Sequence, residues 1–84
     1  MKKTWVEWII QAFNELGGKA VYDVLYDRIR DIRTEPFSRE WKATVRRTIE
    51  THSSDSDNYR ENSTDFFYSV GGKGSGYWGI RSHK

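Results

Sequence analysis

Hydrophobic side chains recur at helical spacing in the first part of the chain. Thr4 and Glu7 have the spacing of a capping box, which predicts the start of a helix. The apolar side chains that follow lie three or four residues apart, on one face of that helix: Trp5, Ile9, Ala12, Phe13 and Leu16. Gly17 and Gly18 predict its end, because glycine adopts the left-handed cap conformation without steric cost. The next two residues, Lys19-Ala20, are long enough only for a stub of strand.

Two more helices are predicted in the middle of the chain. The first runs roughly from Tyr22 to Arg33, with one apolar face made of Val21, Val24, Leu25, Ile29 and Ile32. Residues 34–37 form a turn, because Pro36 lacks an amide hydrogen and biases Glu35 away from the helix. Ser38 is the expected N-cap of a third helix that runs to about His52. Its buried face is expected to hold Trp41, Val45, Thr48 and Ile49.

The last third of the chain predicts a β-hairpin. Residues 53–64 are polar and acidic without periodicity, which is typical of a loop. Residues 65–70 and 77–81 are rich in aromatic side chains with strand propensity, and the glycine-rich stretch 71–76 joins them. The order helix, stub strand, helix, helix, strand, strand is that of a winged helix. We therefore expect an α+β fold of the winged helix-turn-helix type, with three helices, a short stub strand and a C-terminal β-hairpin wing. A chain of 84 residues is too short for two cores, so residues 1–84 are expected to form a single domain.

Composition excludes several classes of function. The chain has no cysteine and only two histidines, which rules out disulfides and thiolate zinc sites and argues against a histidine-built metal site. No apolar run approaches the roughly 20 residues that span a bilayer, and no signal segment follows the N-terminal Met1-Lys2-Lys3. We expect a soluble, cytoplasmic protein with no cofactor and no membrane partner.

Charge is distributed unevenly along the chain. Residues 28–47 carry seven basic and three acidic side chains, whereas residues 48–70 carry one basic and five acidic side chains. The segment from Gly71 is basic again. The formal net charge of +2 is too small to indicate nucleic-acid binding, but this division predicts a polarised surface.

The third helix supplies the main candidate contacts for double-stranded DNA. A count of 100° per residue places Arg39, Ala43, Arg46 and Glu50 opposite the core, flanked by Lys42 and Arg47. The basic side chains can reach phosphates or the acceptor pair of guanine, and Ala43 can touch a methyl group on a base. The alternative is that this basic face is only solvated. Further candidates are Lys73 at the hairpin tip and Ser53 and Tyr59 in the acidic loop, which could also bring Asn58 to the DNA backbone.

Catalysis has little support in the sequence. Glu40-Trp41-Lys42 has the Glu-x-Lys spacing of metal-dependent nucleases, but it lies on a predicted helix and no paired acidic residue on a strand precedes it. The loop that starts at Ser53 begins like a calcium loop, but Tyr59 and Arg60 stand where a ligand and a glycine belong. We therefore do not expect this chain to be an enzyme.

Several segments together resemble a known group of domains. They are residues 16–20 (LGGKA), 23–26 (DVLY), 41–49 (WKATVRRTI), 52–56 (HSSDS), 65–67 (DFF) and 77–81 (YWGIR). In this order they resemble the winged-helix domains that accompany bacterial restriction endonucleases, including those of the HNH type. The glycine-rich tip is longer than the turn usual in such domains. The resemblance implies a DNA-targeting module with a fused or associated nuclease domain, either free-standing or one end of a larger enzyme. Some such domains read methylated adenine, so it also implies modified DNA as a candidate target within a restriction system.

Two other functions remain open at the level of sequence. A winged helix can serve protein–protein contact, for which Trp8 and Tyr22 are the exposed candidates together with the acidic loop. A transcriptional regulator of the same fold would instead prefer one operator sequence.

Overall fold

The first helix, α1 (Trp5–Glu15), begins and ends where its sequence signals predict. In the computed structural model of the chain, which describes residues 3–72 and 74–81, the Thr4 amide donates to the Glu7 carboxylate at 2.7 Å. The Glu7 amide donates in return to the Thr4 hydroxyl at 3.3 Å, which completes the predicted capping box. Gly17 and Gly18 have φ angles of 87° and 100°, and their amides donate to the Asn14 and Phe13 carbonyls. Both predicted ends are confirmed.

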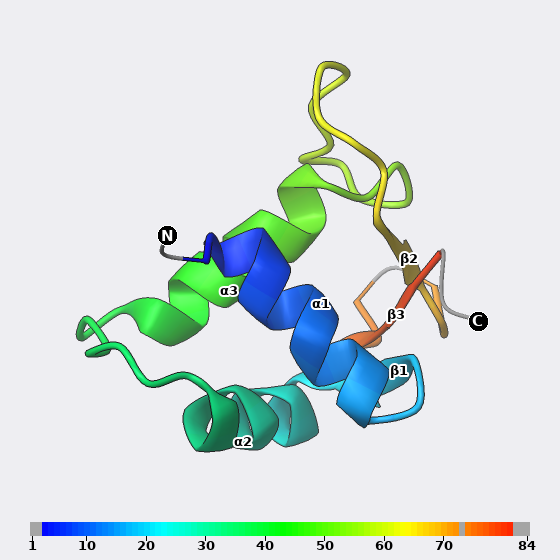
Figure 1. Cartoon of the computed structure of the whole chain (residues 1–84). Helices are drawn as coiled ribbons and strands as arrows, with labels where there is room; N and C mark the ends of the chain where they lie inside the picture. The colour runs from blue at the N-terminus through cyan, green and yellow to red at the C-terminus, as the bar shows by residue number, and fades with distance from the viewer. Residues whose placement is uncertain (1–2, 73, 82–84) are drawn as a thin grey trace.

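Residues 3–72 and 74–81 form an α+β arrangement of three helices and a three-stranded antiparallel sheet (Figure 1). The other elements are β1 (Lys19–Val21), α2 (Tyr22–Ile32), α3 (Trp41–Thr51), β2 (Phe67–Ser69) and β3 (Tyr77–Ile80). In Figure 1, α1 crosses in front of α3, α2 lies below both, and the sheet stands at one side. This arrangement is compatible with a winged helix. None of the helices in the described part of the chain has the length and apolar character needed to span a bilayer.

The last strand occupies the centre of the sheet. The strand order is β1-β3-β2, and β3 pairs antiparallel with both neighbours. Ala20 of β1 faces Trp78, and Tyr68 of β2 faces Gly79. The predicted stub strand and the predicted hairpin are therefore both confirmed, and the hairpin closes with a bond from the Val70 amide to the Tyr77 carbonyl at 2.8 Å.

Helix α3 begins later than the sequence predicts. Glu40, rather than Ser38, occupies the N-cap position, and it makes no side-chain capping bond. The Phe37 ring packs edge-on against Trp41 with 4.7 Å between centroids, and the Trp5 ring stacks on Trp41 at 6.3 Å. Because these aromatic contacts hold Phe37 beside the first residue of the helix, the residues between them form a turn. The predicted N-cap is wrong for this reason.

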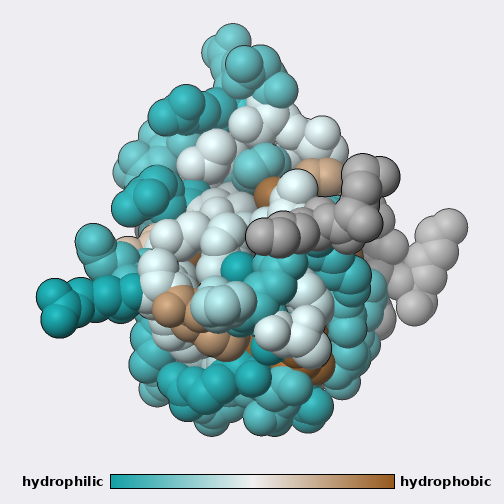
Figure 2. All heavy atoms as spheres, turned by 60° about the vertical axis from the view of Figure 1, so that its left-hand side comes forward, coloured by the Kyte–Doolittle hydropathy of each residue, from teal (hydrophilic) through white to brown (hydrophobic). Residues whose placement is uncertain are grey.

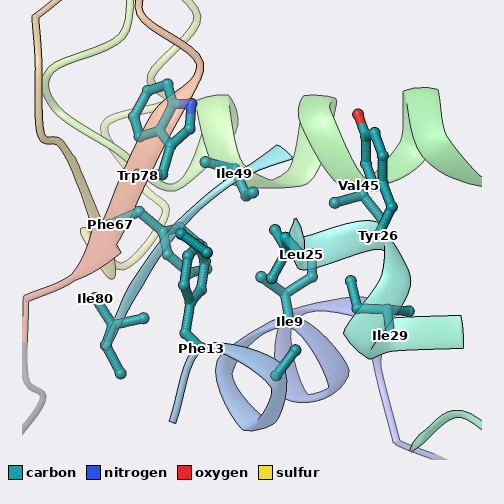
Figure 3. Packing of buried hydrophobic residues seen from close by; sticks show 12 residues of the cluster. Ile9, Phe13, Leu25, Tyr26, Ile29, Val45, Ile49, Phe67, Trp78 and Ile80 are labelled. Carbon is teal, nitrogen blue, oxygen red and sulfur yellow. The ribbon is translucent and has the colours of Figure 1, made fainter. Parts of the chain in front are cut away.

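One hydrophobic cluster joins all three helices to the sheet (Figure 3). Its fully buried side chains include Phe13 from α1, Leu25 and Ile29 from α2, Ile49 from α3 and Phe67 from β2. Phe13 and Phe67 lie in contact, with ring centroids 5.7 Å apart. The helices and the sheet therefore share a single core within the described residues.

The buried faces of α1 and α2 differ from the predicted ones. Trp8, expected to be exposed, is only 8% exposed and belongs to the buried face of α1. On α2 the buried residues include Tyr26, whereas Val21 and Val24 are 41% and 45% exposed. The buried face of α2 is thus rotated by about one residue relative to the prediction, because Tyr26 packs edge-on against Trp41.

Candidate nucleic-acid interface

The outward face of α3 borders an open depression of about 630 Å³. Successive turns of the helix supply most of its lining, because residues three or four apart lie on one helix face. The lining residues are Ala43, Arg46, Arg47, Glu50, Thr51, Asn58 and Arg60. Arg46, Arg47 and Arg60 are exposed and Ala43 is half-buried. Three of the predicted contacts, Ala43, Arg46 and Arg47, therefore lie together on one surface.

Lys42 lies beside this surface, above aromatic rings. Its ammonium group is 5.3 Å from the Tyr26 ring centroid and 5.9 Å from that of Trp41, which is the geometry of cation–π contacts. The Tyr26 hydroxyl is buried without a hydrogen-bond partner in the described structure. Figure 3 shows it on the side of Tyr26 nearest α3. Burial raises the pKa of Tyr26, and nearby Arg46 opposes this rise. Lys42 and Arg46 thus flank a neutral phenol.

Three other predicted contacts, Arg39, Ser53 and Tyr59, lie elsewhere. Arg39 is exposed but precedes α3, so its predicted place on the helix face is wrong. Ser53 is fully buried and its hydroxyl accepts from the Asp55 amide at 3.2 Å, so it is not available to DNA. Tyr59 is half-buried and donates its hydroxyl to the Ser63 carbonyl at 3.3 Å, within its own loop. Lys73 lies outside the described residues.

Arg60 is a further candidate contact, which was not predicted from the sequence. Arg60 is the one Lys or Arg residue in the acidic segment 48–70. A single basic side chain among acidic ones was the signal in the sequence that could have indicated this contact. Its amide donates to the Thr51 carbonyl at 3.2 Å, which ties the loop to the last turn of α3. The loop therefore adds a third guanidinium to the two of the helix.

A smaller and acidic depression adjoins the basic one. It has a volume of about 200 Å³ and is lined by Glu50, Asp55, Ser56, Asp57, Asn58, Ser69, Gly74 and Trp78. Glu50 and Asn58 line both depressions, so they mark the boundary between the basic and the acidic side. No group of acidic and histidine side chains among the described residues is arranged to hold a metal ion.

Arg81 fixes the acidic loop to the sheet. Its guanidinium lies 3.0 Å from the Asp65 carboxylate and 3.4 Å from that of Asp55. Asp65 also accepts from the Ser54 amide at 2.9 Å and from its hydroxyl at 2.6 Å, and Asp55 accepts from the Ser69 amide at 2.9 Å. The Arg81 side chain therefore cross-links the loop from within. This cross-link holds the loop that supplies Asn58 and Arg60 beside α3.

We predict that this cross-link makes stability acid-sensitive. Partial burial acts to raise the pKa of Asp65, but the hydrogen bonds from Ser54 and Arg81 outweigh it and hold the pKa below its ordinary value. A carboxyl whose pKa is lowered by folding stabilises the protein above its unfolded pKa, near 3.9, and loses this contribution as pH falls through the folded pKa. We expect Asp65→Asn to lower the free energy of unfolding by about 1 kcal/mol at pH 7 and to flatten its decline between pH 5 and pH 2. Urea unfolding across this range measures both effects. The exposed Asp31 of α2 gives the control Asp31→Asn, and equal pH profiles for the two variants would contradict the prediction.

One face of the molecule is mostly hydrophilic, with hydrophobic residues confined to small areas (Figure 2).

The two residues predicted to support protein contact do not form an exposed patch. Trp8 is buried, and the Tyr22 hydroxyl is buried without a hydrogen-bond partner in the described residues. Burial raises the pKa of Tyr22 to about 12, the Glu50 charge adds to the rise, and the Trp78 indole beside it opposes the rise. The predicted exposure is therefore wrong for Trp8, whereas Tyr22 is half-buried with its hydroxyl group inside.

Comparisons with protein-family models, with curated proteins and with solved structures give no match to this chain.

Proposed function

We propose that the chain is a winged-helix module that binds double-stranded DNA. In this proposal α3 is the recognition helix that enters the major groove, and the β2–β3 hairpin is the wing. The chain acts by binding and not by catalysis. A fused or associated nuclease domain is the partner that the sequence resemblance implies.

The observation that carries the proposal is the convergence of three guanidinium groups on one open surface. Arg46 and Arg47 come from α3 and Arg60 comes from the loop that follows it, and all three line the same depression. Exposed guanidinium groups pair with phosphate oxygens and with the O6 and N7 atoms of guanine. Lys42 extends this basic surface at the start of α3. A helix with such a basic surface can contact both the phosphate backbone and the groove of a duplex.

Salt dependence tests the proposal on the intact chain. Each phosphate that the protein neutralises releases condensed counterions, so the logarithm of the association constant falls with the logarithm of salt by about 0.9 per contact. We expect fluorescence anisotropy with a labelled duplex to give a slope of about −3 to −4, which corresponds to the four basic side chains. Absence of binding to a duplex at low salt would overturn the proposal.

Adenine methylation is the more specific target that the sequence resemblance suggests. Ala43, half-buried on the floor of the basic depression, is the small apolar contact that suits a methyl group on a base. We expect a duplex with methylated adenine to bind at least about tenfold more tightly than the same plain duplex, from roughly 1.4 kcal/mol of additional contact. Gel-shift titration of both duplexes measures the ratio. Equal affinities would remove the modified-base target and leave duplex binding in place.

A further inference from the structure

Glu50 fixes the orientation of the Asn58 side chain. The Asn58 amide nitrogen, Nδ2, donates to Glu50 Oε1 at 2.6 Å. An ionised carboxylate only accepts hydrogen bonds, so the amide must turn its nitrogen toward Glu50 and its oxygen away. One N–H of Asn58 is used in this bond. The other N–H and the Oδ1 atom have no further partner among residues 3–72 and 74–81.

The backbone of Asn58 is held as firmly as its side chain. Its amide donates to the Ser56 hydroxyl at 3.0 Å, and the next amide, of Tyr59, donates to the Ser56 carbonyl at 3.3 Å. The bond from the Arg60 amide to Thr51 then ties this turn to the end of α3. A polar group held in one orientation before binding loses little conformational entropy when a ligand arrives. Asn58 is therefore a preorganised hydrogen-bonding group.

The charges around Asn58 select what can approach it. Arg46, Arg47 and Arg60 line the depression on one side and attract phosphate. Asp55, which lines the other depression, pairs with Arg81 at 3.4 Å. The Glu50 carboxylate lines both depressions and disfavours a phosphate at the boundary between them. For a duplex bound on the basic side, this charge would favour the edge of a base over the phosphate backbone at the boundary between the two depressions. Asn58 lies at that boundary.

We propose that Asn58, oriented by Glu50, reads an adenine in the major groove. An asparagine amide recognises adenine by two bonds: its oxygen accepts from the N6 amino group and its nitrogen donates to N7. The two free groups of Asn58 are this acceptor and this donor. Guanine presents an O6 acceptor where adenine presents the N6 donor, so it would face the Oδ1 atom with like partial charge. Glu50 is a positioning residue in this proposal, which rests on the proposed binding of duplex DNA.

Selection from a randomised duplex library tests the inference on the whole chain. We expect the duplexes bound by the wild-type protein to be enriched in adenine at one position. Asn58→Ala should lose that preference, keep the others, and bind the selected duplex about tenfold more weakly, as expected for one bidentate contact of 1–3 kcal/mol. Replacing the selected adenine by 7-deazaadenine, which lacks N7, should weaken binding to the wild-type protein and leave binding to Asn58→Ala unchanged. Asn62→Ala, at an exposed position of the same loop, is the matched control and should keep the preference.

Two variants of Glu50 separate positioning from charge. Glu50→Gln retains an oxygen that accepts from Asn58 and should keep the adenine preference, whereas Glu50→Ala frees the amide to rotate and should reduce it. Thermal melting followed by circular dichroism verifies that each variant is folded. An adenine preference that survives in Asn58→Ala, or a wild-type selection without any adenine preference, would overturn the inference while duplex binding stands. If the wild-type protein captures no duplex from the library, the proposed function itself fails, and the adenine contact fails with it.

Discussion

Replacing Arg46 and Arg47 together by alanine is expected to weaken duplex binding by at least about 100-fold at low salt. Each substitution removes a charge-assisted hydrogen bond to the duplex, which is worth about 1.5–3 kcal/mol. A loss of 1.4 kcal/mol in binding free energy corresponds to a tenfold loss of affinity. The slope of the salt dependence should also fall in magnitude by about 1.8, since two phosphate contacts disappear. Anisotropy titrations of wild type and variant at several salt concentrations measure both quantities.

The control for this experiment removes two positive charges from elsewhere on the molecule. Lys19 belongs to β1, and Arg28 of α2 pairs with Glu15 at 3.8 Å. Neither residue lines the basic depression. The Lys19→Ala, Arg28→Ala double variant changes the net charge by the same amount, but we expect its affinity and its salt slope to stay close to those of wild type. Equal losses in the two double variants would mean that net charge, and not the α3 surface, determines binding.

Replacing Phe67 by alanine is expected to have the largest effect on stability. Phe67 of β2 is fully buried against Phe13 of α1, so the change removes a ring and leaves a cavity, at a cost of about 3–5 kcal/mol. Total stabilities of domains lie near 5–15 kcal/mol. For a domain of this size, each kcal/mol shifts the melting temperature by about 4–8 °C. We therefore expect a fall of more than about 12 °C in calorimetry.

The neighbouring phenylalanine supplies a matched control. Phe66 has the same side chain but is only half-buried, against His52 and Phe67. Phe66→Ala should therefore lower the free energy of unfolding by roughly 1 kcal/mol. A loss as large as that of Phe67→Ala would contradict the assignment of Phe67 to the centre of the core.

The elements of the fold could be predicted because their signals are local. Thr4 and Glu7 satisfy each other within one helical turn, and Gly17 and Gly18 end α1 by their own conformations. The hairpin follows likewise from two short strand segments joined by glycines. None of these signals depends on distant parts of the chain.

Errors in the sequence analysis arose where distant packing overrides a local signal. Ser38 is a suitable cap by residue type, but aromatic contacts of Phe37 and Trp41 set the start of α3. Ser53 is polar and lies in a polar loop, yet the fold buries it completely. Trp8 is a different case, because it lies three residues after Trp5 and one before Ile9. Its helical spacing contained the information that it is buried.

The candidate site was predictable only in part. The basic residues of α3 follow from helical spacing alone. The position of Asn58 and Arg60 beside them depends on the cross-link between Arg81 and two aspartates, which joins segments distant in sequence. The periodicity of the sequence carries no information on such a link. The acidic segment could therefore be recognised as a loop, but its position beside α3 could not be predicted.

The central position of β3 has a consequence for the order in which the protein folds. As the chain leaves the ribosome, its three helices emerge before residues 77–80, and domains generally fold as units. Within the described residues, β1 and β2 pair only with β3, so they have no strand partner until those residues arrive. The sheet therefore closes last, by contacts between residues as distant as Lys19 and Gly79, and such non-local contacts are slow to form. During synthesis, the backbone edges of β1 and β2 therefore remain without their pairing strand until β3 is released.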